Sequence, residues 1–151
     1  MATGVLLRMD IGRAAAGDLP EIRELLRACD LRDEDVGEAG QQFLLARSQG
    51  RLAGCIGLEL HGPDALLRSF AVSPAWRRQG LGAALHERAV EEARALGVQR
   101  LFLLTNTVRE RAARSGFEDV PREAVPASIR EGAQFGLLCP ATSACMQLRI
   151  G

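Results

Sequence analysis

The stretch that decides the fold is FAVSPAWRRQGLGAA, residues 70–84. An apolar run ends at a proline, and two arginines and two glycines follow before a helical pattern begins. The exposed N–H groups at the start of a helix attract anions, and glycine lets a ligand approach the backbone closely. Arginine adds charge-assisted hydrogen-bond donors that suit phosphate groups. This order of residues predicts a strand, a loop that cradles a phosphate or pyrophosphate, and a helix.

The helix after the loop is predicted to reach about residue 96, where Gly97 provides the stop. Its apolar side chains recur at helical spacing. The predicted buried stripe consists of Leu81, Leu85, Ala89, Ala93 and Leu96. His86 falls on the opposite, polar face, so we expect a solvated side chain there.

The rest of the chain alternates between strand and helix patterns. Ile22, Leu25, Leu26 and Cys29 have the spacing of an amphipathic helix. Strands are predicted over residues 6–13, 43–47, 51–61, 65–72, 100–104, 117–120 and 144–150, and short helices over 108–114 and from residue 126. Strands that precede and follow single helices indicate an α/β fold with a mixed sheet. The length of 151 residues predicts one domain over 1–151.

Composition excludes several classes of function. Nineteen basic and nineteen acidic residues give zero net charge, which removes the electrostatic motive for bulk nucleic-acid binding. Every basic residue is arginine, and the chain has neither lysine nor tyrosine, so Schiff-base and phenol chemistry are excluded. No apolar run approaches the roughly 18–20 residues of a membrane helix. We therefore expect a soluble, cytoplasmic protein with no membrane partner.

Other phosphate-binding loops fit this sequence less well. A Walker loop needs G-K-[ST], which is absent from the chain. The dinucleotide fingerprint needs three glycines and an acidic residue at the end of a later strand, and neither is present. On the loop alone, a glycine-assisted turn with solvated arginines remains the alternative.

The order of strand, hairpin, strand and loop-helix resembles the GCN5-related N-acetyltransferases (GNAT). The family signature Q/R-x-x-G-x-G/A is met by Arg77, Gly80 and Gly82, and residues 115–117 match the family's "GF" position. The resemblance covers nearly the whole chain. It implies a single GNAT-like domain with a central mixed sheet, flanking helices and strands that splay apart at a cofactor groove.

What the resemblance implies about ligands is acetyl-CoA as co-substrate, with no metal. The pantetheine would bond to the backbone of one strand end, and the pyrophosphate to the N–H groups of residues 78–83. The cofactor-binding residues are expected to be Phe70, Ala71, Val72, Arg77, Arg78, Gln79, Gly80, Leu81, Gly82 and Ala83. The acceptor is expected to be a small amine, with residues 121–135 as a wall of its pocket. A homodimer is compatible with the sequence.

Glu59 is the candidate catalytic base, because it ends a strand where family bases can lie and burial can raise the pKa of a carboxyl group. The alternative is a salt bridge. A tight turn at residues 62–63 would pair Glu59 with Leu66 and place Arg68 on the diagonal. By strand alternation, Cys55 and His61 share the face of Glu59, while residues 52, 54, 56, 58 and 60 share the other. We expect His61 to be an exposed turn residue.

The sequence departs from the family at the general acid. Family members usually carry an aromatic pair before "GF", where this chain has Arg111 and Ala112. Water, Thr105, Ser115 or Cys139 could protonate the leaving thiolate, or no acid is needed.

A narrower likeness links several segments to a subfamily often associated with arsenic-resistance operons. The segments are residues 43–46, 57–59, 66–69 and 138–140, with Cys145 and Met146. The four cysteines contain no C-x-x-C pair and are expected to be free thiols. Cys139 and Cys145 are either core residues or a soft-ligand site for a thiophilic species. A non-catalytic CoA-binding or arsenical-sensing protein is therefore the alternative to an enzyme.

Overall fold

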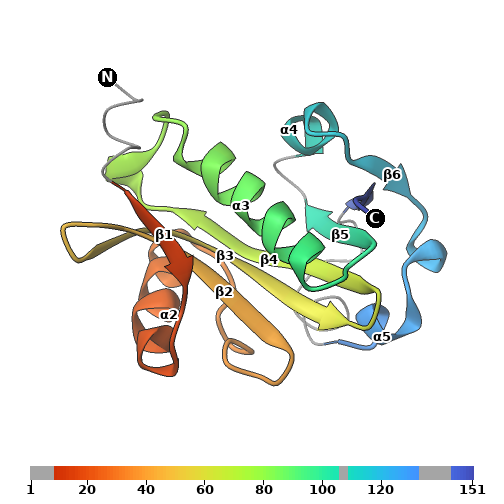
Figure 1. Cartoon of the computed structure of the whole chain (residues 1–151), viewed down its shortest axis with the longest axis horizontal. Coiled ribbons are helices and arrows are strands. Elements are labelled where there is room, and N and C mark those ends of the chain that lie inside the picture. The colour runs from red at the N-terminus through yellow and green to blue at the C-terminus, as the bar shows by residue number, and fades with distance from the viewer. Residues whose placement is uncertain (1–8, 106–108, 133–143) are drawn as a thin grey trace.

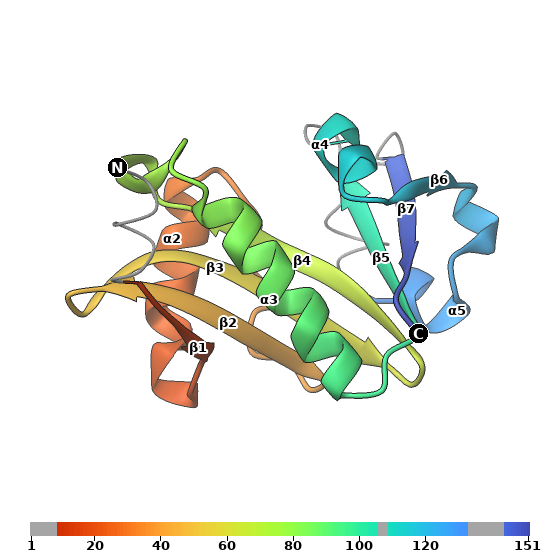
Figure 2. The same ribbon diagram turned by 45° about the horizontal axis from the view of Figure 1, so that its top comes forward.

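The computed structural model describes residues 9–105, 109–132 and 144–151. Its strands form one sheet in the order β1-β2-β3-β4-β5-β7-β6. Figure 1 labels β1 to β6, and Figure 2 also labels β7. The strands are β1 (Asp10–Arg13), β2 (Gln41–Ser48), β3 (Arg51–His61), β4 (Asp64–Val72), β5 (Arg100–Thr105), β6 (Glu118–Val120) and β7 (Ala144–Arg149). The β4–β5 pair is parallel and the other pairs are antiparallel, so the predicted mixed sheet is confirmed.

Helices cover both faces of this sheet. They are α2 (Leu19–Ala28), α3 (Leu81–Ala95), α4 (Arg109–Arg114) and α5 (Ala127–Arg130), with short 3₁₀ turns at Ala16–Asp18, Pro74–Trp76 and Arg122–Ala124. The long helix α3 crosses one face and α2 packs on the other, as both ribbon views show (Figures 1 and 2). None of the described helices is both long enough and apolar enough to cross a membrane.

The core divides between the two faces of the sheet. Leu44 belongs to the cluster under α3 and its neighbour Leu45 to the cluster under α2, because successive strand residues point to opposite faces. The predicted stripe of α3 is confirmed at Leu81, Leu85, Ala89 and Ala93. The prediction that Leu96 belongs to this buried stripe is wrong. The helix ends at Ala95, and Leu96 is 38% exposed beside the left-handed Gly97.

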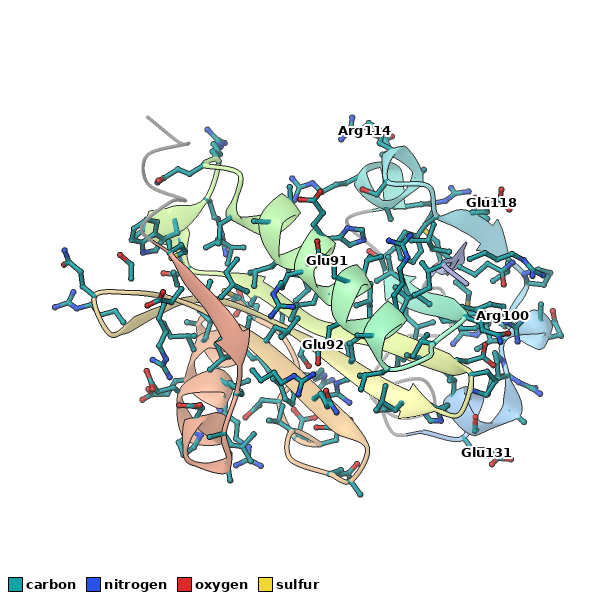
Figure 3. The ribbon with its side chains drawn as sticks, viewed as in Figure 1. Glu91, Glu92, Arg100, Arg114, Glu118 and Glu131 are labelled. Carbon is teal, nitrogen blue, oxygen red and sulfur yellow. The ribbon has the colours of Figure 1, made fainter. Side chains whose placement is uncertain are left out.

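One acidic side chain of α3 points into the sheet side of the helix. The carboxylate of Glu92 is buried and lies 2.5 Å from the guanidinium of Arg13 on β1. Figure 3 labels Glu92 and the exposed Glu91 on this helix. The edge strand β1 is thus held by charge as well as by its pairing with β2.

A β-bulge corrects the predicted faces of β3. Two consecutive pairs are Ala46 with Gly54 and Arg47 with Leu52, so Ala53 is an extra residue in β3. An extra residue reverses the alternation beyond it. Leu52 therefore packs with the α2 cluster, and not on the face that plain alternation predicts.

A second bulge bends β4. The consecutive pairs here are Cys55 with Ala71 and Gly57 with Arg68, so β4 contains an extra residue. Ser69 takes up the distortion with a φ of +52°, a left-handed conformation that is uncommon outside glycine. Bulges of this kind strengthen the local twist and re-aim a strand.

The strands β4 and β5 separate where β4 enters this bulge. Their pairing ends at Leu67 with Leu103, although β4 continues to Val72. Figure 2 shows the two strands diverging from the lower right of the view. The β4 edge that faces β5 has no strand partner in the described chain beyond Leu67. The predicted splayed strands are therefore confirmed.

The sequence predicts a solvated side chain for His86, and this prediction is wrong. Its ring centre lies 5.7 Å from that of Phe117, and its Nε2 is buried without a hydrogen-bond partner among the described residues. Burial lowers the pKa of His86, and the charge of Glu87 opposes this more weakly. The helical period could not show that the segment ending in Phe117 packs over this side of α3.

We expect His86 to make folding less favourable in acid. Because its pKa is lowered in the folded protein, the unfolded chain binds the proton more readily. The associated stability is present above the unfolded-state pKa of about 6.5 and falls as the pH drops below it. His86→Gln should remove this part of the pH dependence of the free energy of unfolding. Urea unfolding of both proteins from about pH 8 to pH 5 measures it. An equal slope in the variant would refute the assignment.

Candidate functional site

The loop between β4 and α3 presents backbone N–H groups at a helix start. Gly80 is the N-cap of α3 with a φ of +84°, and no side chain caps the helix. Arg78 is also left-handed, with a φ of +64°. The first N–H groups of a helix have no partner inside it, so those of residues 81–83 can meet a ligand. This geometry suits an anion, and the pyrophosphate assignment remains a prediction.

The structure brings this loop against the end of β4. A Cβ added to Gly82 would lie 3.7 Å from Phe70 and 3.9 Å from Val72. Phe70 and Val72 pack against the α3 cluster, while Ala71 is buried with the α2 cluster. The strand-end and loop parts of the predicted cofactor site therefore adjoin each other beside the open edge of β4.

Three side chains hold the loop between β4 and α3 in place. Arg77 donates from Nε to the carbonyl of Val72 at 3.1 Å, and its Nη2 lies 3.5 Å from the sulfur of Cys29. Arg77 thus ties the loop to the end of β4 and the end of α2. Gln79 donates to the carbonyl of Ala75 at 3.2 Å, which closes the turn before the helix. Trp76 packs against the α3 cluster.

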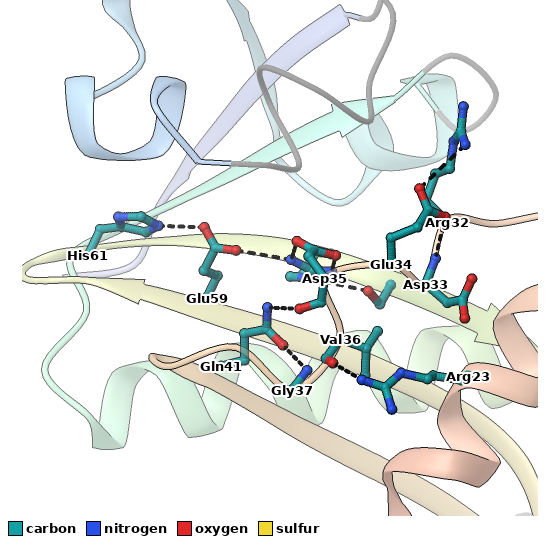
Figure 4. Close-up of polar contacts among 12 residues, drawn as sticks. Arg23, Arg32, Asp33, Glu34, Asp35, Val36, Gly37, Gln41, Glu59 and His61 are labelled. Carbon is teal, nitrogen blue, oxygen red and sulfur yellow. Dashed lines mark hydrogen bonds and ion pairs between the residues drawn. The ribbon is translucent and has the colours of Figure 1, made fainter.

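A chain of charged side chains lies across the face of the sheet opposite α3 (Figure 4). Asp35, in the loop after α2, accepts two hydrogen bonds of 2.5 Å from the guanidinium of Arg68. Arg68 donates a third, of 3.0 Å, to Oε1 of Glu59. Oε2 of Glu59 lies 2.7 Å from Nε2 of His61. We call these four residues the carboxylate–histidine network.

The network is shielded from solvent. The side chains of Arg68, Asp35, Glu59 and His61 are 0%, 5%, 12% and 15% exposed. Burial by itself lowers the pKa of Arg68, but the hydrogen bonds and charges of Asp35 and Glu59 outweigh it and raise that pKa above its usual range. Arg68 is therefore a permanent cation, and its pairing with the two carboxylates fixes their positions.

Part of this arrangement follows from the sequence. Glu59 pairs with Leu66, and the diagonal contact with Arg68 is present, so the predicted salt bridge is confirmed. The prediction for His61 is wrong: the ring folds back onto Glu59 instead of being exposed in the turn. Asp35 was missed, because the acidic stretch of residues 30–40 offers no spacing that singles out one carboxylate.

The buried ion pair between Asp35 and Arg68 should add several kilocalories per mole to the free energy of unfolding. Asp35→Asn leaves the buried guanidinium of Arg68 short of an anion, and breaking a buried pair costs about 3–5 kcal/mol. The neighbouring Glu34→Gln is the matched control, because its pair with Arg32 is exposed and worth about 0–1 kcal/mol. Urea unfolding compares the two variants. Equal losses of stability would show that burial does not set the strength of this pair.

The predicted acceptor wall, described as far as residue 132, reaches Glu59. Val125 and Ile129 pack on a cluster that includes Leu66. A Cβ added to Gly132 would lie 3.3 Å from Oε2 of Glu59. Residues 133–135 of that wall lie outside the described residues. Two surface hollows of about 360 and 370 Å³ lie elsewhere and contain neither Glu59 nor the loop.

The structure describes two of the three candidate acids. Thr105, at the end of β5, is 8% exposed. Ser115 is exposed and its hydroxyl donates to the carbonyl of Arg111 at 3.2 Å. Ala112 is buried in the core where the family has an aromatic residue. Cys139 lies outside the described residues.

Cys29 and Cys55 are free thiols. Burial raises the pKa of the Cys55 thiol to about 12, against a weaker opposing backbone hydrogen bond, so Cys55 stays protonated. Cys145 is 4% exposed in the cluster under the predicted acceptor wall, which agrees with a core role. Among the described residues, no group of three or more His, Cys, Asp or Glu side chains could hold a metal ion.

The chain is similar to curated amino-acid acetyltransferases. It is 31% identical over 129 residues to the Mycobacterium tuberculosis protein of that name, which covers 79% of this chain and 74% of the relative. It is 26% identical over 132 residues to the Neisseria meningitidis protein, covering 82% of this chain and 30% of the relative. The chain thus spans about a third of the length of the Neisseria relatives. These comparisons give no support to the arsenic-associated subgroup.

Solved structures agree with this fold. N-acetylglutamate synthase from Neisseria gonorrhoeae, complexed with coenzyme A and N-acetyl-glutamate, superposes with a TM-score of 0.80 at 25% identity, over 95% of this chain and 35% of that one. The M. tuberculosis protein Rv2747, in complex with CoA, gives a TM-score of 0.75 at 27% identity, over 93% and 98% of the two chains. Residues 12–117 match the profile of the Acetyltransferase (GNAT) family. The chain therefore belongs to the GNAT family of acetyltransferases.

Proposed function

We propose that this protein transfers the acetyl group of acetyl-CoA to the α-amino group of a free amino acid, with glutamate as the first candidate acceptor. The observation that carries the proposal is the open edge of β4, which adjoins the uncapped start of α3. The Mycobacterium tuberculosis relative is an amino-acid acetyltransferase, and two similar solved structures hold coenzyme A; both observations support the proposal.

The backbone would hold the co-substrate at two places. The N–H groups of residues 78–83 would bind the pyrophosphate, since a helix start favours negative charge. The unpaired edge of β4 near Phe70, Ala71 and Val72 would bond the pantetheine as an added strand does. One N–H of that edge would also polarise the thioester carbonyl, in the manner of an oxyanion hole.

The transfer would occur in a ternary complex. The amine of the acceptor attacks the thioester carbonyl, the C–N bond forms, and the C–S bond breaks with release of the CoA thiolate. Before it can attack, the ammonium group must lose a proton, and Glu59 is the proposed base. The carboxylate lies on the sheet face opposite α3, between the loop after α2 and the segment ending in Gly132.

Steady-state thiol release tests the proposal. The acceptors are glutamate, glutamine, aspartate, a polyamine, and peptides with basic or ribosomal-protein sequences. We expect acceptor-dependent thiol release with at least one amino acid and none with the peptides. Release with peptides alone would overturn the proposed acceptor class.

Binding without turnover distinguishes the alternative. If calorimetry shows tight acetyl-CoA binding and no acceptor releases thiol, the chain is a CoA-binding protein and the enzymatic proposal fails. If acetyl-CoA does not bind, both the acetyltransferase proposal and the CoA-binding alternative fail.

A further inference from the structure

Both oxygens of Glu59 already have partners. Oε1 accepts from Arg68 at 3.0 Å, and Oε2 lies 2.7 Å from Nε2 of His61. A proton that came to rest on Glu59 would weaken its bond to a guanidinium that is fully buried. The geometry of the network therefore opposes a neutral Glu59, and His61 is the neighbour that can take the proton.

The charges of the network point the same way. Asp35 and Arg68 form a two-bonded pair whose charges cancel. Glu59 then leaves a net charge of −1 when His61 is neutral. One added proton on the Glu59–His61 pair brings the network to zero, which stabilises the proton in a shielded environment.

We propose that Glu59 and His61 act as one proton-accepting pair, so that the proton removed from the acceptor's ammonium group comes to rest on His61. This inference rests on the proposed function. Imidazole is the side chain whose ordinary pKa lies near neutrality, and a base matched to the working pH is the most effective. His61 is thus a positioning and proton-storing residue that acts through Glu59.

The proton balance of the step is simple. The ammonium group gives one proton to Glu59, and that proton moves along the 2.7 Å contact to Nε2 of His61. The neutral ring accepts it in the tautomer that carries its own hydrogen on Nδ1, so the imidazolium then has one hydrogen on each nitrogen. Glu59 is again a carboxylate, facing Arg68 on one side and an imidazolium on the other. After transfer of the acetyl group, the imidazolium releases its proton to solvent. No electrons are exchanged and no other co-reactant is needed.

Other charged groups near the pair are already engaged. Asp64, the cross-strand partner of His61 on β4, forms a two-bonded ion pair with Arg100 of β5 at 2.8 and 3.1 Å. From the acceptor wall, Arg130 donates to the carbonyl of Val125 at 2.9 Å. Among the described residues, Glu59 is the carboxylate that contacts His61.

The test uses the pH dependence of kcat/KM in His61→Gln, Glu59→Gln and the double variant. Glutamine at 61 can still bond Glu59 but cannot hold the proton. We expect the acid limb of the profile to move to lower pH in His61→Gln, with turnover near neutrality reduced at least tenfold (about 10²-fold is typical for proton transfer). Acetyl-CoA affinity should not change. The double variant should be about as slow as Glu59→Gln, because residues that act as a unit are not additive.

His86→Gln is the matched control, since the chain has two histidines and His86 lies far from the network on α3. Its acid limb should coincide with that of the wild type. An acid limb unmoved in His61→Gln, or additive losses in the double variant, would overturn the pair.

A measurement without turnover separates this failure from failure of the proposed function. In ligand-free protein, nuclear magnetic resonance follows the titration of the His61 ring. Glu59→Gln should move its midpoint to lower pH, because an adjacent negative charge is lost. If the wild type acetylates no amino acid, the proposed function fails. If the His61 midpoint is the same in Glu59→Gln, the pair fails whatever the turnover.

Discussion

Glu59→Gln is expected to lower turnover by roughly 10²–10⁴-fold, the usual effect of removing a general base. Acetyl-CoA affinity should be retained, because the variant leaves the loop and the open edge of β4 intact. Thiol release by a known amount of folded protein measures the first quantity, and calorimetry with acetyl-CoA measures the second.

The same change also weakens the contact of Glu59 with Arg68, so stability must be measured beside activity. A purely structural role predicts lower stability with full turnover per folded molecule. That result would assign Glu59 to the ion pair alone. Glu38→Gln, an exposed carboxylate of the loop after α2, is the control and should match the wild type in both assays.

Gly80→Glu should weaken acetyl-CoA binding by roughly 10- to 1,000-fold. Its carboxylate would face the bound phosphates at close range, where like charges cost about 1–4 kcal/mol. The substitution also places a side chain on backbone with a φ of +84°, which lowers stability. Calorimetry on the folded variant measures the loss of affinity.

Gly97→Glu is the control that separates charge repulsion from backbone strain in Gly80→Glu. Gly97 follows the other end of the same helix with the same φ of +84°, and a Cβ there meets nothing within 4 Å. It should lose similar stability and keep its affinity for acetyl-CoA. Equal affinities in both variants would place the pyrophosphate away from the start of α3.

The sequence predicts those parts of the fold that depend on periodic patterns and on glycine. The stripe of α3 from Leu81 to Ala93, the stop at Gly97 and the strands predicted over residues 43–47 and 51–61 depend on local residues, and all are confirmed. The splay of β4 and β5 comes from the family resemblance, because no pattern within residues 64–72 marks where the pairing ends.

Three of the errors come from pairing or packing between different segments of the chain. A bulge at Ala53 changes the face of Leu52 without changing any local propensity. His86 is buried by Phe117, which lies far along the chain. The path of the loop after α2 brings Asp35 to Arg68, so no sequence pattern indicates that these two residues form a pair.

The candidate site divides in the same way. The loop and the strand end are local motifs, so the sequence alone is enough to predict them as a cofactor site. The diagonal contact between Glu59 and Arg68 could be predicted from one tight turn, since the register follows from it. The fold of His61 onto Glu59 depends on a side-chain rotamer, which strand alternation does not determine.

The most direct test of the account is a single incubation of the protein with acetyl-CoA and an equal mixture of the common protein amino acids, followed by mass spectrometry of the small molecules. The account predicts one or a few N-acetyl amino acids, formed in the same amount as free CoA and absent from a Gly80→Glu reaction. Acetyl-CoA that remains intact in the presence of every amino acid, while the folded protein binds it, would contradict the account.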